Sequence, residues 1–406
     1  MSRSIAHLAL LLGLITAIGP FAIDSYLPAL PTLGASLQAS PAAVQMSLTV
    51  FFMIIGVCQL FYGPISDVFG RKPPIYAGLV IFAVASIGCA LAPTIEVLIG
   101  FRALQAFGAC AGMVIPRAVV RDLYTGHEAA RLMALLMLVM SVSPILAPLA
   151  GSVIISIWSW REVFAALAIV ALLCLVMTAV QLPETHPAER RLGKTIGSAI
   201  GSYGTLLRDP VFIGLAVVSG FGLATFFVFI GSAPFVYIEY FGLTPTQFSL
   251  CFALNAASFF TMNQLTARLS RRYGLARVIR GSVIATASVM TVLGLTTFWG
   301  SHLAVMMTLL FIGFGFLGLL LPAVGVLSLE DHGAVAGSTS ALLGAIQMIT
   351  AALSMSLVGV FADHTPAPML IGIALCAVAA MLISLWTLHR LQARPSSGTP
   401  NTPPAD

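Results

Sequence analysis

Long apolar segments follow one another along almost the whole chain, from Ile5 to Leu388. Crossing the hydrocarbon core of a bilayer takes roughly 20 apolar residues in a helix, and each segment is about that long. The segments are continuous and do not alternate with period two, which argues against a β-barrel. Hydrophobic residues make up 59% of the 406 residues, so much apolar surface must face lipid. We therefore expect an all-α membrane protein.

Twelve transmembrane helices fit the chain. The first apolar segment follows Arg3 and could pass for a signal peptide. It carries Asp24 and ends at Pro31 without a small-residue cleavage site, so we count it as a helix. The expected helices span 6–31, 43–66, 74–92, 95–117, 131–156, 163–182, 211–238, 246–268, 277–298, 302–327, 335–362 and 367–388.

Basic residues mark one side of the membrane. With the N-terminus placed inside, all of the 19 Lys and Arg residues except Arg102 and Arg161 fall in loops or at helix ends on the same side. Because cytoplasmic loops carry an excess of Lys and Arg, we expect both termini to be cytoplasmic. The net charge of +5 follows from this topology, so no nucleic-acid partner is expected.

No pattern of catalytic or metal-binding residues stands out. The six cysteines lie inside the expected helices without ligand spacing, and the seven histidines show no metal spacing. The chain has no G-x-x-x-x-G-K-[ST] loop, which argues against ATP as the energy source. We expect no enzyme activity, no cofactor and no metal.

The chain divides at its longest polar interval. We expect an N-terminal six-helix bundle at 1–182, a cytoplasmic central loop at 183–210, a C-terminal six-helix bundle at 211–390 and a disordered cytoplasmic tail at 391–406. A short repeat supports the division, because 65–70 (ISDVFG) parallels 269–274 (LSRRYG). Two parallel repeats around a central site are typical of transporters.

Asp24 is the only carboxylate well inside an expected helix. A charge at such depth costs several kcal/mol, from ~2.5 upward, so the side chain must face a cavity, pair with a cation or be protonated. Burial disfavours the charged form and would let the group exchange protons. The alternative is a carboxylate at a helix end that touches periplasmic water.

Arg102 is expected at a depth similar to that of Asp24, counted from the ends of two antiparallel helices. Gln105 lies one turn further, and Gly108 and Gly112 continue a small face that allows close helix approach. The guanidinium could bias the protonation of Asp24. It could equally be a structural hydrogen-bond anchor.

The fifth expected helix carries Pro144 and Pro148, one turn apart, followed by small residues to Gly151. Such a sequence would bend the helix and let another pack closely against it. A possible substrate cavity would be lined by polar and aromatic side chains of several helices. Each of these could instead make an interhelical hydrogen bond or pack in the core; they are Tyr26, Gln59, Gln105, Phe226, Phe229, Asn255 and Gln347.

Residues 63–72 (GPISDVFGRK) resemble the signature loop of the major facilitator superfamily, usually G-x-x-x-D-R-x-G-R-[RK]. Val68 replaces the first arginine of that pattern. Residues 23–31 (IDSYLPALP), 121–124 (RDLY) and 234–239 (PFVYIE) resemble the Bcr/CflA drug-resistance subfamily. The matching loop residues are Gly63, Asp67, Gly70, Arg71 and Lys72.

The resemblance implies the twelve-helix fold of that superfamily and a proton-driven exporter of lipophilic drugs in the bacterial inner membrane. Its partners would be the drug, protons and membrane lipid, and nothing in the sequence requires more than a monomer. Residues 102–108 (RALQAFG) are similar to the family's fourth-helix motif, whose arginine is tied to proton coupling. Residues 147–151 (APLAG) match the family's antiporter motif G-P-x-x-G-G in part. Thr16 stands where some relatives carry a second acid, which argues against a two-acid mechanism.

Three functions remain open from the sequence. The leading hypothesis is drug/proton antiport by alternating access, with Asp24 as the proton carrier. A proton-coupled transporter of a small metabolite would share the fold, and a non-transporting receptor is the third possibility. In the gating hypothesis, Asp67 caps the helix that begins near Gly333, and Arg71 pairs with Asp122.

Overall fold

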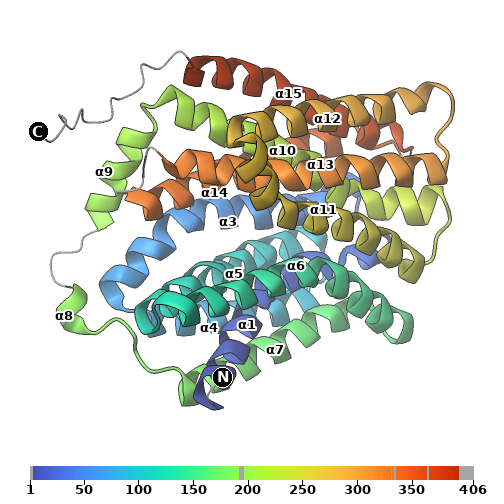
Figure 1. Ribbon diagram of the computed structural model, residues 1–406. Helices are drawn as coiled ribbons and strands as arrows, with labels where there is room; N and C mark the ends of the chain where they lie inside the picture. Colours follow the sequence, from blue (N-terminus) through green and yellow to red (C-terminus); the bar gives the residue numbers. More distant parts are fainter. Residues whose placement is uncertain (1–2, 192–195, 331, 333–334, 364, 393–406) are drawn as a thin grey trace, which may run out of the picture.

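A computed structural model describes residues 3–191, 196–330, 332, 335–363 and 365–392. Within this part of the chain all regular structure is helical (Figure 1). The elements are α1 (Arg3–Asp24), η1 (Leu27–Ala29), α2 (Leu30–Ser36), α3 (Pro41–Phe69), α4 (Lys72–Ala90), α5 (Ile95–Leu123), α6 (Gly126–Ile157), α7 (Trp160–Gln181), α8 (Ala188–Arg191), α9 (Ile196–Leu206), α10 (Pro210–Pro234), η2 (Phe235–Tyr240), α11 (Pro245–Tyr273), α12 (Leu275–Leu295), η3 (Thr296–Phe298), α13 (Leu303–Glu330), α14 (Ala336–Val360) and α15 (Ala367–Gln392).

The twelve expected helices correspond to the twelve longest helices of the described chain. Eleven segments of the described chain are long and apolar enough to cross a membrane. The remaining helix, α11, has the same length as α3, but polar residues such as Asn255, Asn263 and Gln264 lower its hydropathy. Helix α5 continues to Leu123 and α6 begins at Gly126, so both extend beyond their expected bounds toward the loop that joins them. Polar loop residues continue their backbone hydrogen bonding there.

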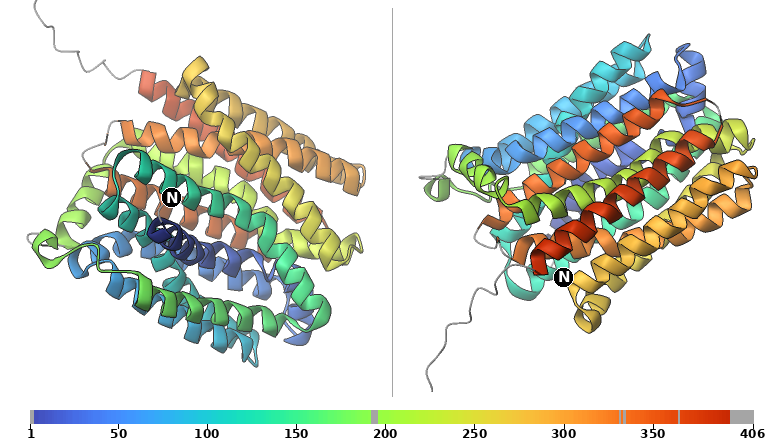
Figure 2. Two further views of the ribbon diagram at one scale, coloured as in Figure 1. Left: turned by 60° about the horizontal axis from the view of Figure 1, so that its bottom comes forward. Right: turned by 90° about the horizontal axis from the view of Figure 1, so that it is seen from above.

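The long helices form two bundles whose internal packing repeats. In the first bundle α5 packs on α3 and α4, α7 on α4, and α6 on α1. The second bundle repeats these neighbours in chain order, with α13 on α11 and α12, α15 on α12, and α14 on α10. Figure 1 shows the first bundle in blue to green and the second in yellow-green to red, and the views of Figure 2 show the same division. This is the expected all-α transporter architecture.

Helices α3 and α14 join the two bundles, as do α6 and α11. Helix α3 runs antiparallel to α14: Gln45 lies at Gly359, Gly56 packs against Met348, and Gln59 lies at Gly344. A Cβ atom at Gly359 or Gly344 would meet the side-chain amide of the opposite glutamine, and one at Gly56 would press on Met348, so the two helices pack closely over this length. Beyond Gln59 the two helices separate.

The first transmembrane segment is not one continuous helix, contrary to expectation. Helix α1 ends at Asp24, and the chain continues through a turn, η1 and α2. Pro28 explains the break, because it has no N–H to donate to the carbonyl of Asp24. Asp24 therefore lies at the end of a helix, two residues before the fully buried Tyr26, and not two turns inside one.

The seventh expected helix also changes form near its end. Helix α10 stops at Pro234 and is followed by the π-helical turn η2. π-Helical turns are rare in proteins, and those that do occur often lie at functional sites. The described part of the central loop is also more structured than expected, since it contains α8 and α9. The expected tail begins within α15, which continues to Gln392, and its residues 393–406 lie outside the described chain.

Helix α6 makes its closest approach to α1 at the break after Asp24. A Cβ atom at Gly151 would overlap the carbonyl group of Ser25. The small-residue face predicted for this helix thus allows direct backbone contact. Gly112 plays the same part where α5 meets the carbonyl of Ile15.

Gly151→Ala should destabilise the protein by about 1–3 kcal/mol, because a methyl group must force α6 away from Ser25. Thermal unfolding of the detergent-purified protein measures this as a fall in Tm of several degrees. Gly325→Ala in α13 is the matched control, since no atom lies within 4 Å of its Cβ position. Equal Tm values for the two variants would show that this contact does not limit helix packing.

Candidate functional site

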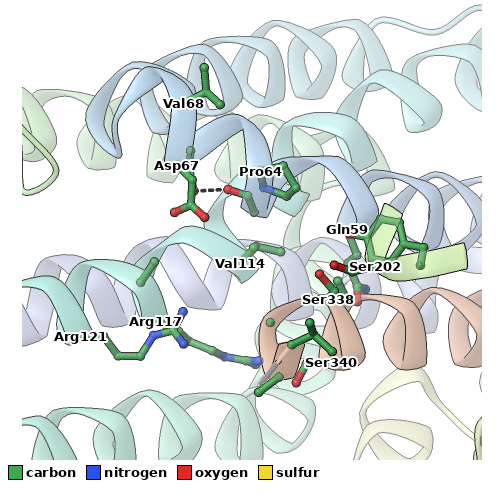
Figure 3. Close-up of a pocket in the computed structure, with 18 of the residues that line it drawn as sticks. Gln59, Pro64, Asp67, Val68, Val114, Arg117, Arg121, Ser202, Ser338 and Ser340 are labelled. Carbon is green, nitrogen blue, oxygen red and sulfur yellow. Dashed lines mark hydrogen bonds between the residues drawn. The ribbon is translucent and has the colours of Figure 1, made fainter. Parts of the chain in front are cut away.

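A cavity of about 660 Å³ lies between the two bundles at the end that carries the 63–72 loop, called the basic end below. Its walls come from α3, α5, the start of α14 and the linker helix α9 (Figure 3). Gln59, Val114 and Ala341 lie deepest along their helices, where α3 and α14 come together. Of the seven side chains predicted to line a substrate cavity, Gln59 alone lines this one.

The opposite end of the bundle pair is closed. Ser249 on α11 donates a hydrogen bond to the carbonyl of Pro148 on α6, at 3.0 Å. The rings of Phe52 on α3 and Phe227 on α10 are in contact, tilted by 32° with centroids 3.9 Å apart. With the Gln45–Gly359 contact, these interactions hold the bundles together from the centre outward. In the described chain the 660 Å³ cavity is therefore closed off from this end.

Arg71 is the centre of the charged loop. Its guanidinium donates to Asp122 at 2.8 Å, to Asp67 at 2.6 Å and to Ser66 at 2.7 Å. The predicted contact between Arg71 and Asp122 is thus present. The Arg71 side chain is only 6% exposed. Burial alone would lower the pKa of Arg71, but the hydrogen bonds and charges of Asp122 and Asp67 raise it, so the guanidinium stays charged.

Glu184, from the start of the linker, caps this loop. Its carboxylate accepts hydrogen bonds from the backbone N–H groups of Arg71 at 2.9 Å and Lys72 at 3.1 Å, at the start of α4. Burial alone would raise the pKa of Glu184, but these N–H groups, that of His186 and the charge of Arg191 hold it below its usual value. The linker therefore fixes the backbone of the 63–72 loop where α4 begins.

Gly70 is required for that cap. Its φ is +93°, a backbone conformation that residues other than glycine rarely adopt. A Cβ atom there would also meet the Glu184 carboxylate and the Arg191 guanidinium. Gly63, by contrast, faces the open cavity, and Lys72 lies over the ring of Tyr76.

The other gating contact was expected between Asp67 and the helix start near Gly333. Gly333 lies outside the described residues. In the described chain, Asp67 and the first turns of α14, from Val335 to Ala341, line the same cavity. Figure 3 shows Asp67 on one side of this space and Ser338 and Ser340 on another.

Arg102 is fully buried at the junction of α5 with α1, α3 and α7. It donates to the carbonyl of Ala22 at 3.0 Å, to Gln105 at 2.5 Å and to the Tyr26 hydroxyl at 3.4 Å. Gln105 in turn donates to Ser86 on α4 at 2.7 Å. The guanidinium also lies 4.1 Å from the ring centre of Phe51 and 4.5 Å from that of Tyr26, in cation–π contact.

The expected direct facing of Asp24 and Arg102 is not observed. The guanidinium binds Ala22 and Tyr26, on either side of Asp24, and no ion pair joins the two charges in the described chain. The break at Pro28 is the reason, because it presents a carbonyl and a hydroxyl to the guanidinium in place of the carboxylate. These contacts agree with the second expectation for Arg102, that it is a structural hydrogen-bond anchor.

Asp24 itself is 4% exposed. Within the described chain its carboxylate has no hydrogen-bond or ion-pair partner. It lies in the membrane-spanning part of the first segment, His7–Ser36. A buried carboxylate without a cation is costly when ionised, so the protonated form is favoured until water or a cation reaches it.

An aromatic cluster fills the second bundle between α10, α11 and α13. Phe226 stacks on Phe259 at 5.6 Å and meets Phe314 edge-on at 5.2 Å, and Phe229 stacks on Phe252 at 5.7 Å. Asn255 shares the α11 face of Phe252 and Phe259 and is fully buried, and neither its amide nitrogen nor its oxygen has a hydrogen-bond partner in the described chain. Gln347 is partly buried on α14, away from this cluster.

Several residues of the cavity and loop were not predicted from the sequence. Glu184, Ser202 and Tyr203 come from the linker, and the Tyr203 hydroxyl donates to the carbonyl of Leu60 at 2.8 Å. Arg117 and Arg121 were counted as topological charges, but both line the cavity. Their spacing of one turn on α5 is the sequence signal that could have placed both of them in the cavity.

Twelve long helices in two bundles, eleven of them apolar enough to cross a membrane, with a cavity between the bundles that is closed at one end, define a membrane transporter. The family model of the Major Facilitator Superfamily matches residues 12–355. The chain belongs to this superfamily, as the signature loop indicated, and it is a multi-pass protein of the bacterial inner membrane.

Relatives extend over nearly the full chain. An uncharacterised transporter of this type from Bacillus subtilis (strain 168) is 35% identical, covering 89% of this chain and 90% of the relative. A bicyclomycin resistance protein homolog from Haemophilus influenzae is 27% identical, covering 94% and 96%. Multidrug resistance protein D of Escherichia coli (strain K12) is 29% identical, covering 86% and 88%. These relatives agree with the predicted drug-resistance resemblance.

A solved D-xylose-proton symporter has the same fold, with a TM-score of 0.71 at 16% identity, covering 95% of this chain and 96% of the symporter.

Glu184→Gln should lower the stability of the protein at neutral pH by about 1–2 kcal/mol, since it removes the charge that accepts three hydrogen bonds from backbone N–H groups. The contribution of Glu184 is present above its unfolded pKa, near 4.3, and is lost as the pH falls through its lowered folded pKa. The Tm of the wild type should therefore approach that of the variant in acid. Glu189→Gln in α8, an exposed neighbour, is the control. A constant Tm difference down to low pH would contradict the cap.

Proposed function

We propose that this protein exports lipophilic drugs in exchange for protons by alternating access. The basic end is taken as cytoplasmic, because Lys and Arg accumulate in cytoplasmic loops. The 660 Å³ cavity then opens to the cytoplasm and the closed end faces the periplasm. The names of the relatives support a drug as the transported molecule.

The observation that carries the proposal is the state of Asp24. It is a buried carboxyl group without a partner in the described chain, at a break in a membrane-spanning segment. Discontinuous helices of this kind are common where transporters bind ions and substrates. A group that is stable only when protonated on one side, and ionises when water enters, can carry a proton.

Energy coupling follows from this exchange. The drug enters from the cytoplasm as Asp24 releases its proton there, and Asp24 takes up a proton from the periplasm as the drug leaves. Each proton that moves down the membrane potential supplies about 2.3 kcal/mol per 100 mV. The Arg102 guanidinium is held by the carbonyl of Ala22, the amide of Gln105 and the ring of Phe51 without a carboxylate, so the coupling proposed here does not depend on an ion pair with Asp24.

The Arg71 network is proposed as the cytoplasmic gate. Opening toward the periplasm requires the basic ends of α3 and α14 to approach, which would bring Asp67 toward the start of α14. The close packing at Gln45 and Gly359, and the bond from Ser249 to Pro148, would then separate. Gln59 would contact the drug first, and Tyr26, Gln105, Phe226, Phe229, Asn255 and Gln347 are proposed to contact it once the bundles rock apart.

Asp24→Asn should abolish drug export driven by a pH gradient, because an amide cannot release a proton. Proteoliposomes with an imposed pH gradient and a drug such as chloramphenicol measure this directly. Folding should be preserved, since the amide is uncharged like the protonated acid, and an unchanged Tm checks it.

Glu96→Gln, an exposed acid at the start of α5, is the control for charge removal and should transport normally. Undiminished proton-driven export by Asp24→Asn would refute the assignment. Accumulation of the drug in whole cells, in place of its export, would show an importer.

Arg71 and Asp122 should behave as one unit in a double-mutant cycle. Arg71→Gln and Asp122→Asn both break the Arg71–Asp122 hydrogen bonds and should each lower export severalfold. The double variant should lose no more than the worse single variant, because residues in one network are not additive. Multiplied losses would mean that the two side chains act separately in the gate.

A further inference from the structure

Two arginines face the cavity without a counter-ion. Arg117 and Arg121 lie one turn apart on α5, and both line the cavity. Neither has a hydrogen bond or an ion pair in the described chain. Figure 3 shows both side chains in the space between Asp67 and the serines of α14.

The acids that belong to the 63–72 loop network are already engaged by other groups. Asp67 and Asp122 bind Arg71, and Glu184 binds the backbone at Arg71 and Lys72 and lies 3.7 Å from Arg191. Among the described residues, no further acid lines the cavity. The described lining from the start of α14 and from α9 is uncharged: Ser202, Tyr203, Val335, Ala336, Gly337, Ser338, Ser340 and Ala341. Arg117 and Arg121 therefore leave the cavity with excess positive charge.

This arrangement is more specific than the general excess of basic residues in cytoplasmic loops. Like charges at i and i+4 on a helix destabilise it by some tenths of a kcal/mol. Both residues lie on the helix face turned to the cavity, where a low-dielectric wall on each side focuses their field. A cleft with one sign of charge raises the local concentration of oppositely charged molecules by roughly 10-fold or more.

We propose that this cavity selects its substrates by charge, admitting organic anions and neutral polar molecules and rejecting lipophilic cations. Arg117 and Arg121 are the specificity-determining residues. They lie at the mouth of the cavity, whereas the buried Asp24 does not line it and offers no negative charge to a cation there. The proposal rests on the proposed function only in taking the cavity as the entrance for substrates.

The test uses two dyes that share a xanthene ring system and differ in charge. Fluorescein is anionic and rhodamine 123 is cationic. Proton-driven transport of each dye is measured in phosphatidylcholine proteoliposomes, and equilibrium binding of each by fluorescence polarisation. The wild type should prefer fluorescein in both assays. The double variant Arg117→Gln/Arg121→Gln should lower the fluorescein-to-rhodamine ratio about tenfold.

Two further variants separate charge from folding. Arg117→Lys/Arg121→Lys retains the charge and should retain the preference. Arg271→Gln removes an exposed arginine at the end of α11, outside the cavity lining, and should leave the ratio unchanged. A lysine variant that loses the preference as the glutamine variant does would overturn charge as the cause.

The remaining outcomes of the dye experiment also test the charge selection. Equal handling of both dyes by the wild type and the glutamine variant would overturn the charge selection while drug/proton exchange stands. If neither dye moves under a proton gradient but the wild type binds fluorescein selectively and the glutamine variant does not, the selection stands and the proposed exchange fails. If added phosphatidylglycerol abolishes fluorescein binding, the two arginines hold lipid headgroups and the proposal is wrong.

Discussion

The cost of an uncompensated charge inside a bilayer decides how this molecule is built. Arg71 is buried because two carboxylates and a serine hydroxyl bind it. Arg102 is buried because a carbonyl, an amide and aromatic rings replace the water that it loses. Asp24 has no such compensation within the described chain, so its charge can exist only when the surroundings change. This is why we propose that Asp24 couples ionisation to conformation.

The two ends of the bundle pair differ in the kind of contact that holds them. The closed end depends on glycines, aromatic contact and one hydrogen bond from Ser249 to a backbone carbonyl, all of which can separate without stranding a charge. The basic end, by contrast, carries the ion pairs of Arg71 with Asp67 and Asp122, all of which lie within the first bundle. This asymmetry suits a protein that must open on one side while it closes on the other.

Hydrophobicity predicted the fold well, because lipid admits few spanning structures and apolar length marks each helix. The pairing of Arg71 with Asp122 was also predicted, since a loop between two helices has few partners in reach. The break after Asp24 depends on one missing N–H at Pro28, which a hydropathy pattern does not register. Glu184 was missed because the backbone groups of Arg71 and Lys72 that it binds are more than a hundred residues away in the sequence. The positions of Arg117 and Arg121 in the cavity were missed because the topology already explained their charge.

Proton release on drug binding tests the central claim most directly. Purified protein in weakly buffered detergent solution is mixed with the drug near neutral pH, and a pH indicator dye counts the protons. We expect the wild type to release about one proton per drug bound, while Asp24→Asn binds the drug and releases none. Equal release from both proteins, or none from either, would contradict the assignment of Asp24 as the coupling group.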